Sequence, residues 1–223
     1  MAEPTATAIS STPAKSADKG TTGPGRPKDP GKRLAVLEAA KRLFVAHGYL
    51  SVSMDQIAAE AGVSKLTVYS HFGDKEALFM AAIQAKCEER LPPSLFAGDS
   101  DVSLRDRLLL IARSFFELIM SEEAIATHRV VTTQHASPEL GRMFWEAGPC
   151  RTQAAMEAFL REEVAAGRLD IPDVHLACSQ FYCLLKGEVH TKRLCGYPAP
   201  TPAETDAHLQ AAVDFFLRAY APR

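Results

Sequence analysis

Apolar residues recur at helical spacing along most of the chain beyond its N-terminal segment. The first stripe comprises Val36, Ala40, Leu43 and Phe44, which a helix from about Gly31 to His47 would bury on one face. No stretch alternates apolar and polar positions in the way of a half-buried strand. The pattern therefore predicts an all-α protein of about nine helices.

Capping residues mark the starts of the next three helices. Ser53 is placed to cap a second helix, and Gln56 completes a capping box with it. Ser64 is placed to cap a third helix, and Asp74 a fourth that ends near Arg90. Two short helices joined by a tight turn are the arrangement of a helix-turn-helix.

The chain beyond Arg90 is helical and strongly apolar, with long helices expected over Leu104–Met120, Pro172–Cys195 and Pro202–Tyr220. The last two have wide apolar faces. Each can cover its own domain on one side and pair with a second copy on the other, in a four-helix bundle. Gly187 would let the backbones approach closely there. We therefore expect a homodimer formed by the last two helices.

Composition divides the chain into three parts. Residues 1–25 hold Thr, Ser, Ala, Pro and Gly with almost no large apolar side chain, which is typical of a disordered tail. Residues 26–90 hold a basic arm and the four N-terminal helices, and residues 91–223 form the larger second domain. No apolar run approaches the roughly 20 residues of a membrane helix. We expect a soluble, cytoplasmic protein.

Charge is distributed unevenly although the formal net charge is only -2. From Arg26 to Lys75 there are eight Lys and Arg residues against five Asp and Glu, whereas the residues after Arg90 hold thirteen against seventeen. The positive charge accompanies the helix pair, where a phosphate backbone would need it. Double-stranded DNA is the partner that this pattern favours.

The predicted third helix buries Val68 and Phe72 and turns polar and aromatic side chains outward. The second helix of a helix-turn-helix lies in the major groove. We predict base contacts there, including one between Leu66 and a thymine methyl group, and phosphate contacts that position the protein. The alternative is an ordinary helical hairpin with a solvated face. The predicted base readers are Lys65, Leu66 and Thr67, and the predicted phosphate contacts are Ser53, Tyr69, His71 and Lys75. Ser64 and the basic-arm residues Arg26 and Lys28 are further predicted DNA-binding residues.

The basic arm permits two interpretations. Gly25-Arg26-Pro27 resembles the core of an AT-hook, and an arginine there would suit the negative potential of a narrow minor groove. The other interpretation is a flexible tail with incidental charge.

The helix-turn-helix segment resembles the TetR family of bacterial transcriptional regulators. The resemblance rests on Gly62-Val63-Ser64, Tyr69, His71-Phe72 and Lys75-Glu76. It implies an all-α homodimer with a small DNA-binding domain and a larger domain for ligand binding and dimerisation. Members of the family usually repress transcription from a palindromic operator and release it when a small molecule binds.

The second domain resembles the C-terminal domain of AefR-like regulators. The resemblance rests on Leu104-Arg105-Asp106-Arg107-Leu108, Pro138-Glu139-Leu140, Phe144, Ala147-Gly148-Pro149 and Leu185-Lys186-Gly187-Glu188. It implies control of an efflux or detoxification operon.

Aromatic residues are frequent in the second domain, and ligand pockets of helical proteins lie between helices and are mostly apolar. The alternative for each aromatic residue is a place in the plain core. The predicted lining residues are Phe115, Ile119, Trp145, Phe159 and Phe181, with His128, Gln134 or Arg129 orienting the ligand.

Other chemistries find little support in the sequence. The five cysteines fit neither a disulfide framework nor zinc-ligand spacing, and we expect no metal or cofactor. Nucleophile motifs and phosphate-binding glycine loops are missing, so we do not expect an enzyme. The alternative to a ligand-responsive regulator is a DNA-binding protein without a pocket, whose second domain only dimerises or senses oxidants through cysteine.

Overall fold

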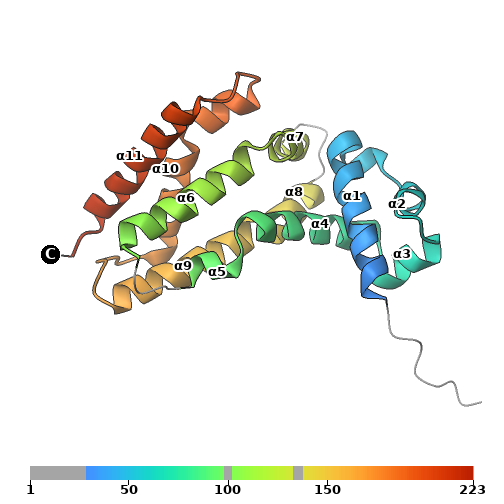
Figure 1. The fold of residues 1–223 in the computed structure, drawn as a ribbon, viewed down its shortest axis with the longest axis horizontal. Helices are drawn as coiled ribbons and strands as arrows, with labels where there is room; N and C mark the ends of the chain where they lie inside the picture. Colours follow the sequence, from blue (N-terminus) through green and yellow to red (C-terminus); the bar gives the residue numbers. More distant parts are fainter. Residues whose placement is uncertain (1–28, 98–101, 133–137, 223) are drawn as a thin grey trace, which may run out of the picture.

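The computed structural model describes residues 29–97, 102–132 and 138–222, and these residues are helical without any strand (Figure 1). The predicted all-α fold is confirmed. The described residues form eleven helical segments, compared with about nine expected; one of the additional segments is the single turn α5, which begins at the proline pair after α4. The helices are α1 Pro30–Ser51, α2 Met54–Glu60, α3 Lys65–Phe72, α4 Lys75–Arg90, α5 Pro93–Phe96, α6 Leu104–Met120, α7 Glu122–Val131, α8 Pro138–Ala147, α9 Pro149–Ala165, α10 Val174–Leu194 and α11 Pro202–Ala219.

The first helices begin and end where local signals predicted. Ser53 and Gln56 form the capping box, with the Ser53 N–H donating to Gln56 Oε1 at 2.7 Å. Ser64 and Asp74 each accept a hydrogen bond from the N–H three residues on, at 3.1 and 2.7 Å. Gly48 has a φ of +75° and interrupts the helical geometry of α1. These caps hold α2 and α3 as two short, separate helices.

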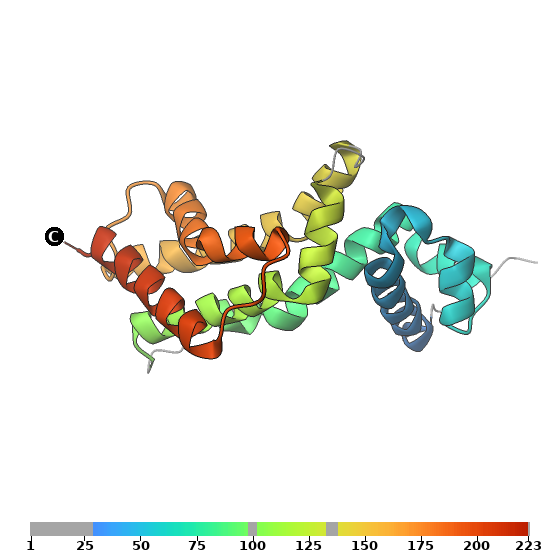
Figure 2. The ribbon, with the colours of Figure 1, turned by 90° about the horizontal axis from the view of Figure 1, so that it is seen from above.

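The molecule is elongated, with α1, α2 and α3 at one end and the C-terminus at the other (Figures 1 and 2). We call α1–α3 the head and α5–α11 the body; α4 runs from one to the other. In the body, α6 packs against α10 and α11, and α9 packs against α10. The head therefore projects from the body, which leaves α2 and α3 accessible.

The head and the body have separate hydrophobic cores that share boundary elements. Val36, Ile57 and Val68 are fully buried in the head core, and Leu140 of α8 belongs to the same cluster. Conversely, Cys87 near the end of α4 packs against the body core. The hydrophobic cores thus cross the expected domain boundary at residue 90, because a residue of the body helix α8 belongs to the head core.

Gly148, between α8 and α9, brings the body into close contact with α4. A Cβ at this position would lie 3.1 Å from Ile83 Cγ2 and 3.2 Å from Cys87 Sγ, both on α4. Such distances are tighter than ordinary van der Waals contact, so a larger residue would push the two elements apart. The corner between α8 and α9 therefore rests directly on α4.

Gly187 bends α10. Its φ of +49° and ψ of -160° are non-helical, and a Cβ there would lie 2.9 Å from His208 Cε1 of α11. His208 Nε2 lies 2.9 Å from the carbonyl oxygen of Leu185, a carbonyl near the bend. The close approach that we expected of Gly187 in a dimer is thus made to a side chain of its own subunit.

A buried ion-pair network joins α6 to α9. The Glu163 side chain is only 1% exposed, and its carboxylate accepts hydrogen bonds from Arg107 Nη1 at 2.8 Å and from Arg168. The Arg107 guanidinium also lies over the Phe159 ring, 4.6 Å from its centroid. Burial alone would raise the pKa of Glu163, but the two arginines hold it below its ordinary value. The carboxylate is therefore charged at neutral pH.

We predict that Glu163→Ala lowers the free energy of unfolding by about 3–5 kcal/mol, because it leaves the Arg107 charge buried without its partner. Urea denaturation followed by circular dichroism measures the change. Glu162→Ala removes a neighbouring exposed carboxylate of α9 and should change the value by less than about 0.5 kcal/mol. Equal effects of the two substitutions would contradict this role for Glu163.

Candidate DNA-binding surface and ligand cavity

The outward face of α3 carries the side chains that the sequence assigned to DNA. Val68 and Phe72 are buried in the head core. Leu66 is 78% exposed, and Lys65 and Tyr69 are exposed on the same short helix. A large apolar side chain with this exposure on a polar helix has no packing role in the monomer. The geometry agrees with a groove-binding helix.

Lys65 has a partner that sequence reasoning missed. Its Nζ lies 2.9 Å from Asp55 Oδ2 of α2, and both side chains are exposed. The hydrogen bond that Lys65 donates to the Asp55 carboxylate raises the pKa of Lys65. Ten positions separate the two residues, so only the fold brings them together. The lysine is therefore not a free cation at the surface.

The hydroxyl groups predicted to touch DNA already take part in helix caps. Ser64 Oγ accepts the Thr67 N–H and lies 2.8 Å from Thr67 Oγ1. Ser53 Oγ accepts the Gln56 N–H. Thr67 and His71 are half-buried, at the edge of the exposed face. Any phosphate contact by these serines would use the remaining hydrogen-bonding capacity of each hydroxyl.

Lys75 is folded back onto the end of α1. Its Nζ lies 4.4 Å from the centroid of the Tyr49 ring and donates to the carbonyl oxygen of Leu50 at 3.4 Å. Burial lowers the pKa of Lys75. This cation–π contact was not foreseen, because it joins residues on different helices. The predicted contacts of Arg26 and Lys28 lie outside the described residues.

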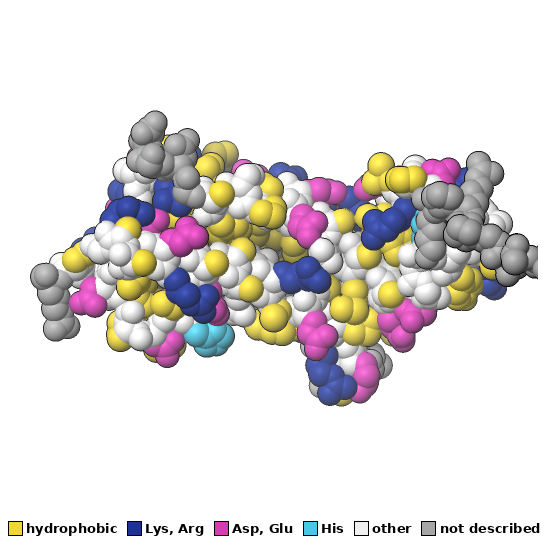
Figure 3. Space-filling model, turned by 90° about the horizontal axis from the view of Figure 1, so that it is seen from below, with side chains coloured by type: hydrophobic (Ala, Val, Ile, Leu, Met, Phe, Trp, Pro, Cys, Tyr) yellow, Lys and Arg dark blue, Asp and Glu magenta, His cyan; other side chains and the backbone are white. Residues whose placement is uncertain are grey.

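Charge on the body is mixed. On the face seen in Figure 3, Lys and Arg side chains alternate with Asp and Glu side chains over the body, and apolar side chains lie exposed between them. A surface that follows a phosphate backbone would instead carry one continuous basic stripe. This face of the body is therefore no second candidate for DNA.

A cavity of about 640 Å³ lies where α1 and α4 meet the body helices α6–α10. Four of the predicted lining residues do line it, namely Phe115, Ile119, His128 and Trp145. The predicted Phe159 and Phe181 are not among its lining residues and lie fully in the body core. Arg129 instead donates to the carbonyl oxygens of Arg193 and Leu194 at 2.9 Å each, and Gln134 is outside the described residues.

The cavity reaches into the head. Phe44 of α1 and Phe79 of α4 line it and also belong to the head core, where their rings meet edge to face at 5.3 Å. On the body side, Phe115 and Tyr182 line it with ring centroids 4.4 Å apart. A molecule in this cavity would touch both parts of the protein at once.

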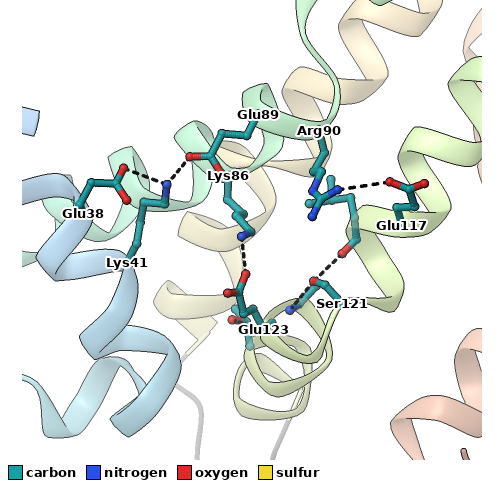
Figure 4. Close-up of polar contacts among 11 residues, drawn as sticks. Glu38, Lys41, Lys86, Glu89, Arg90, Glu117, Ser121 and Glu123 are labelled. Atoms are coloured by element: carbon teal, nitrogen blue, oxygen red, sulfur yellow. Dashed lines mark hydrogen bonds and ion pairs between the residues drawn. The ribbon is translucent and has the colours of Figure 1, made fainter. Parts of the chain in front are cut away.

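Ion pairs join α4 to three neighbouring helices around the cavity (Figure 4). Most of the participating side chains also line the cavity. Exposed ion pairs contribute about 0–1 kcal/mol each, so these contacts can be exchanged at small cost. The pairs are Lys41 of α1 with Glu89, Lys86 with Glu123 of α7, and Arg90 with Glu117 of α6, the last at 3.2 Å. Lys41 also pairs with Glu38 of its own helix.

Two histidines meet beside the cavity. The His128 ring centroid lies 5.2 Å from that of His190 and 5.5 Å from that of Phe144. Burial, followed by the charge of Lys186, lowers the pKa of His128. Burial, His128 and Lys186 lower the pKa of His190 to about 4. Both rings are therefore neutral at pH 7.

The two most buried cysteines are poor candidates for redox sensing. Burial raises the pKa of Cys87 to about 11 and that of Cys178 to about 12. Oxidation requires the thiolate, which both sites disfavour. In the described part of the chain, no group of three His, Cys, Asp or Glu side chains is placed to hold a metal ion, and no described helix is long and apolar enough to cross a membrane.

Two family matches cover most of this architecture. Residues 36–82 match the bacterial regulatory proteins of the tetR family. Residues 106–222 match the C-terminal domain of AefR-like transcriptional repressors. The first match contains the helix-turn-helix and the second contains most of the body.

Solved structures of similar fold extend over nearly the whole chain. A putative TetR-family regulator from Mesorhizobium loti superimposes with a TM-score of 0.71 at 27% identity, covering 85% of this chain and 96% of its own. The flavonoid-responsive regulator FrrA superimposes with a TM-score of 0.69 at 34% identity, covering 86% of this chain and 98% of its own.

Curated relatives match over shorter segments. The transcriptional activator FasR of Mycolicibacterium smegmatis is 35% identical over 88 residues, which are 40% of this chain and 40% of FasR. The repressor AcnR of Corynebacterium glutamicum is 39% identical over 54 residues, covering 24% of this chain and 29% of AcnR. The matched segments thus span less than half of these relatives, which are regulators rather than enzymes. Together with the two family matches, they show that the chain belongs to the TetR family of DNA-binding transcriptional regulators and has an AefR-like C-terminal domain.

Proposed function

We propose that this protein is a dimeric, ligand-responsive repressor that binds a palindromic operator through α3 and leaves it when an aromatic effector fills the cavity. One observation carries the proposal: the cavity is walled both by the head core, at Phe44 and Phe79, and by the body, at Phe115 and Tyr182. The likeness to a flavonoid-responsive regulator supports an aromatic effector.

Repression is the direction of control that the C-terminal domain favours, because it matches a family described as repressors. FasR is an activator and AcnR a repressor, so the N-terminal likeness is compatible with both. The AefR-like domain supports an efflux or detoxification operon as the target. The alternative of cysteine sensing draws no support from the two buried thiols.

The dimer that we propose uses the outer faces of α10 and α11. Leu176 is 51% exposed and Phe215 is 55% exposed, and Leu184 is half-buried. Other apolar residues of these two helices turn inward to the body core. They include Phe181, Leu185, Leu209, Val213 and Phe216. Large exposed apolar side chains on adjacent helices are typical of a helical dimer interface.

A ligand in the cavity would act on DNA through α4. It displaces the packing between α1, α4 and the body and thereby shifts the head, which changes the separation of the two α3 helices in the dimer. Only a molecule with different affinities for the two head positions produces this effect. Coupling free energies of about 1–3 kcal/mol are typical and correspond to a change of about 5- to 150-fold in operator affinity.

The proposal is tested with an operator selected from random duplex DNA and the flavanone naringenin as a probe. We expect naringenin to weaken operator binding by about 5- to 150-fold in a fluorescence anisotropy assay. Ala124→Trp, which fills the cavity at a lining position, should bind the operator but not respond. If saturating naringenin and other aromatic probes leave operator affinity unchanged, the ligand-responsive part of the proposal is wrong.

We predict that Asp55→Asn strengthens DNA binding. The substitution frees Lys65 for a phosphate or base and removes a carboxylate next to the α3 face. The affinity for random duplex should rise by about fivefold, and the slope of log affinity against log salt should steepen by about one. As a control, Glu162→Gln makes the same change of charge in the body and should leave both the DNA affinity and the salt slope unchanged. An unchanged salt slope in Asp55→Asn would place Lys65 outside the interface.

We predict that Phe215→Glu dissociates the dimer, because the interface would bury an unpaired carboxylate, which is strongly unfavourable. Light scattering coupled to size-exclusion chromatography at micromolar concentration should show the mass of one chain. Leu34→Glu replaces an apolar residue of the head with similar exposure, 58% against 55%, and should leave the mass of two chains. A dimeric Phe215→Glu variant would move the interface elsewhere.

A further inference from the structure

The charged side chains that line the cavity are paired, with one exception. Four are basic, namely Lys41, Arg42, Lys86 and Lys186, and three are acidic, namely Glu38, Glu89 and Glu123. Lys41 pairs with Glu38 and Glu89, Lys86 with Glu123, and Arg42 with Glu60. Among the described residues, no ion pair or hydrogen bond is made by the side chain of Lys186. The cavity thus has one lysine whose charge lacks a partner.

No carboxylate in the described part of the chain lies within ion-pair distance of Lys186. It is half-buried on α10, next to the bend at Gly187. The neighbouring Glu188 forms an ion pair with Lys192 instead, with 2.8 Å between Lys192 Nζ and Glu188 Oε1. The charge of Lys186 lowers the pKa of His128 and of His190, and a histidine cannot supply a negative charge. A cavity lysine without a paired carboxylate is a ready partner for an anionic group of a ligand.

The rest of the cavity wall suits a flat ring system. Phe115 and Tyr182 lie on the body side, Phe144 and Trp145 on α8, and Phe79 on the head side. His128 lines the same space and is held against the Phe144 ring. Being neutral, it suits a hydroxyl group or another uncharged polar atom of a ligand rather than a second anion.

We infer that the effector of this cavity is an aromatic molecule with an ionised acidic group, a carboxylate, sulfonate or phenolate, which pairs with the Lys186 ammonium while its rings lie among the aromatic walls. This inference rests on the proposed function in taking the cavity as the effector site. Lys186 is the residue that selects an acidic effector. A charge-assisted hydrogen bond in a partly desolvated site is stronger than one between neutral groups.

Two fluorescent probes with related ring systems test the inference. Anilinonaphthalene sulfonate carries an ionised acid, whereas N-phenylnaphthylamine has the same rings without it. We expect the full-length protein to bind the sulfonate about tenfold more tightly than the neutral amine. The inference predicts that Lys186→Met removes this preference by weakening the sulfonate about tenfold, and that the neutral probe stays within about twofold. Retained binding of the neutral probe also shows that the cavity of the variant is intact.

Two further variants locate the effect. Lys192→Met removes a lysine of the same helix that is paired with Glu188 and does not line the cavity, and it should leave both affinities unchanged. Ala124→Trp should abolish binding of both probes. If Ala124→Trp still binds the sulfonate, the probe occupies another surface and the inference is wrong.

The failures of the inference and of the proposed function are distinguishable. Equal affinities of the two probes in the wild-type protein and in Lys186→Met would overturn the role of Lys186 but leave the cavity as a ligand site. A wild-type protein that binds neither probe would overturn the inference and remove the main support for ligand response.

Discussion

The packing of α4 against two hydrophobic cores is the constraint on which the remaining structure depends. Leu78 and Phe79 are buried in the head core, while Cys87, two turns further on, packs against the body. Gly148 allows the body to rest on the same helix without an intervening side chain. Because protein interiors are close-packed, α4 cannot turn or slide without moving the head. Together with α7 and α8, which also pack against the head core, α4 therefore determines where α3 lies relative to the body.

The contacts inside the body and the contacts around α4 differ in strength. In the body, Glu163 is buried between two arginines and locks α6 to α9. Around α4, the ion pairs are more exposed and border an open cavity. Contacts of the second kind exchange partners readily. The molecule thus combines a firmly packed body with a head whose attachment is adjustable, which is what switching between two packed states requires.

Local signals carried the sequence predictions that the structure confirms. The caps at Ser53, Ser64 and Asp74 involve residues three positions apart, so a linear sequence contains them. The residues that line the cavity were harder to predict, because a helical apolar stripe shows that a residue is buried but not which gap between helices remains unfilled. For this reason the sequence wrongly assigned Phe159 and Phe181 to the cavity wall, whereas both are buried in the body core. Asp55 beside Lys65, Tyr49 beneath Lys75 and Leu140 in the head core are contacts between separate helices, and a single sequence does not reveal them.

Phe44 and Phe79 serve both the head core and the cavity wall, and this double use places an evolutionary limit on the protein. Empty space beside a core lowers stability, and substitutions that fill such space are among the commonest stabilising changes. Here the same substitutions would close the cavity in which we propose that an effector binds. If the protein senses a ligand there, selection for robust folding and selection for sensing act on the same positions in opposite directions. Homologues from warmer habitats should resolve this conflict elsewhere in the chain, in loops and surface charges, and keep the void.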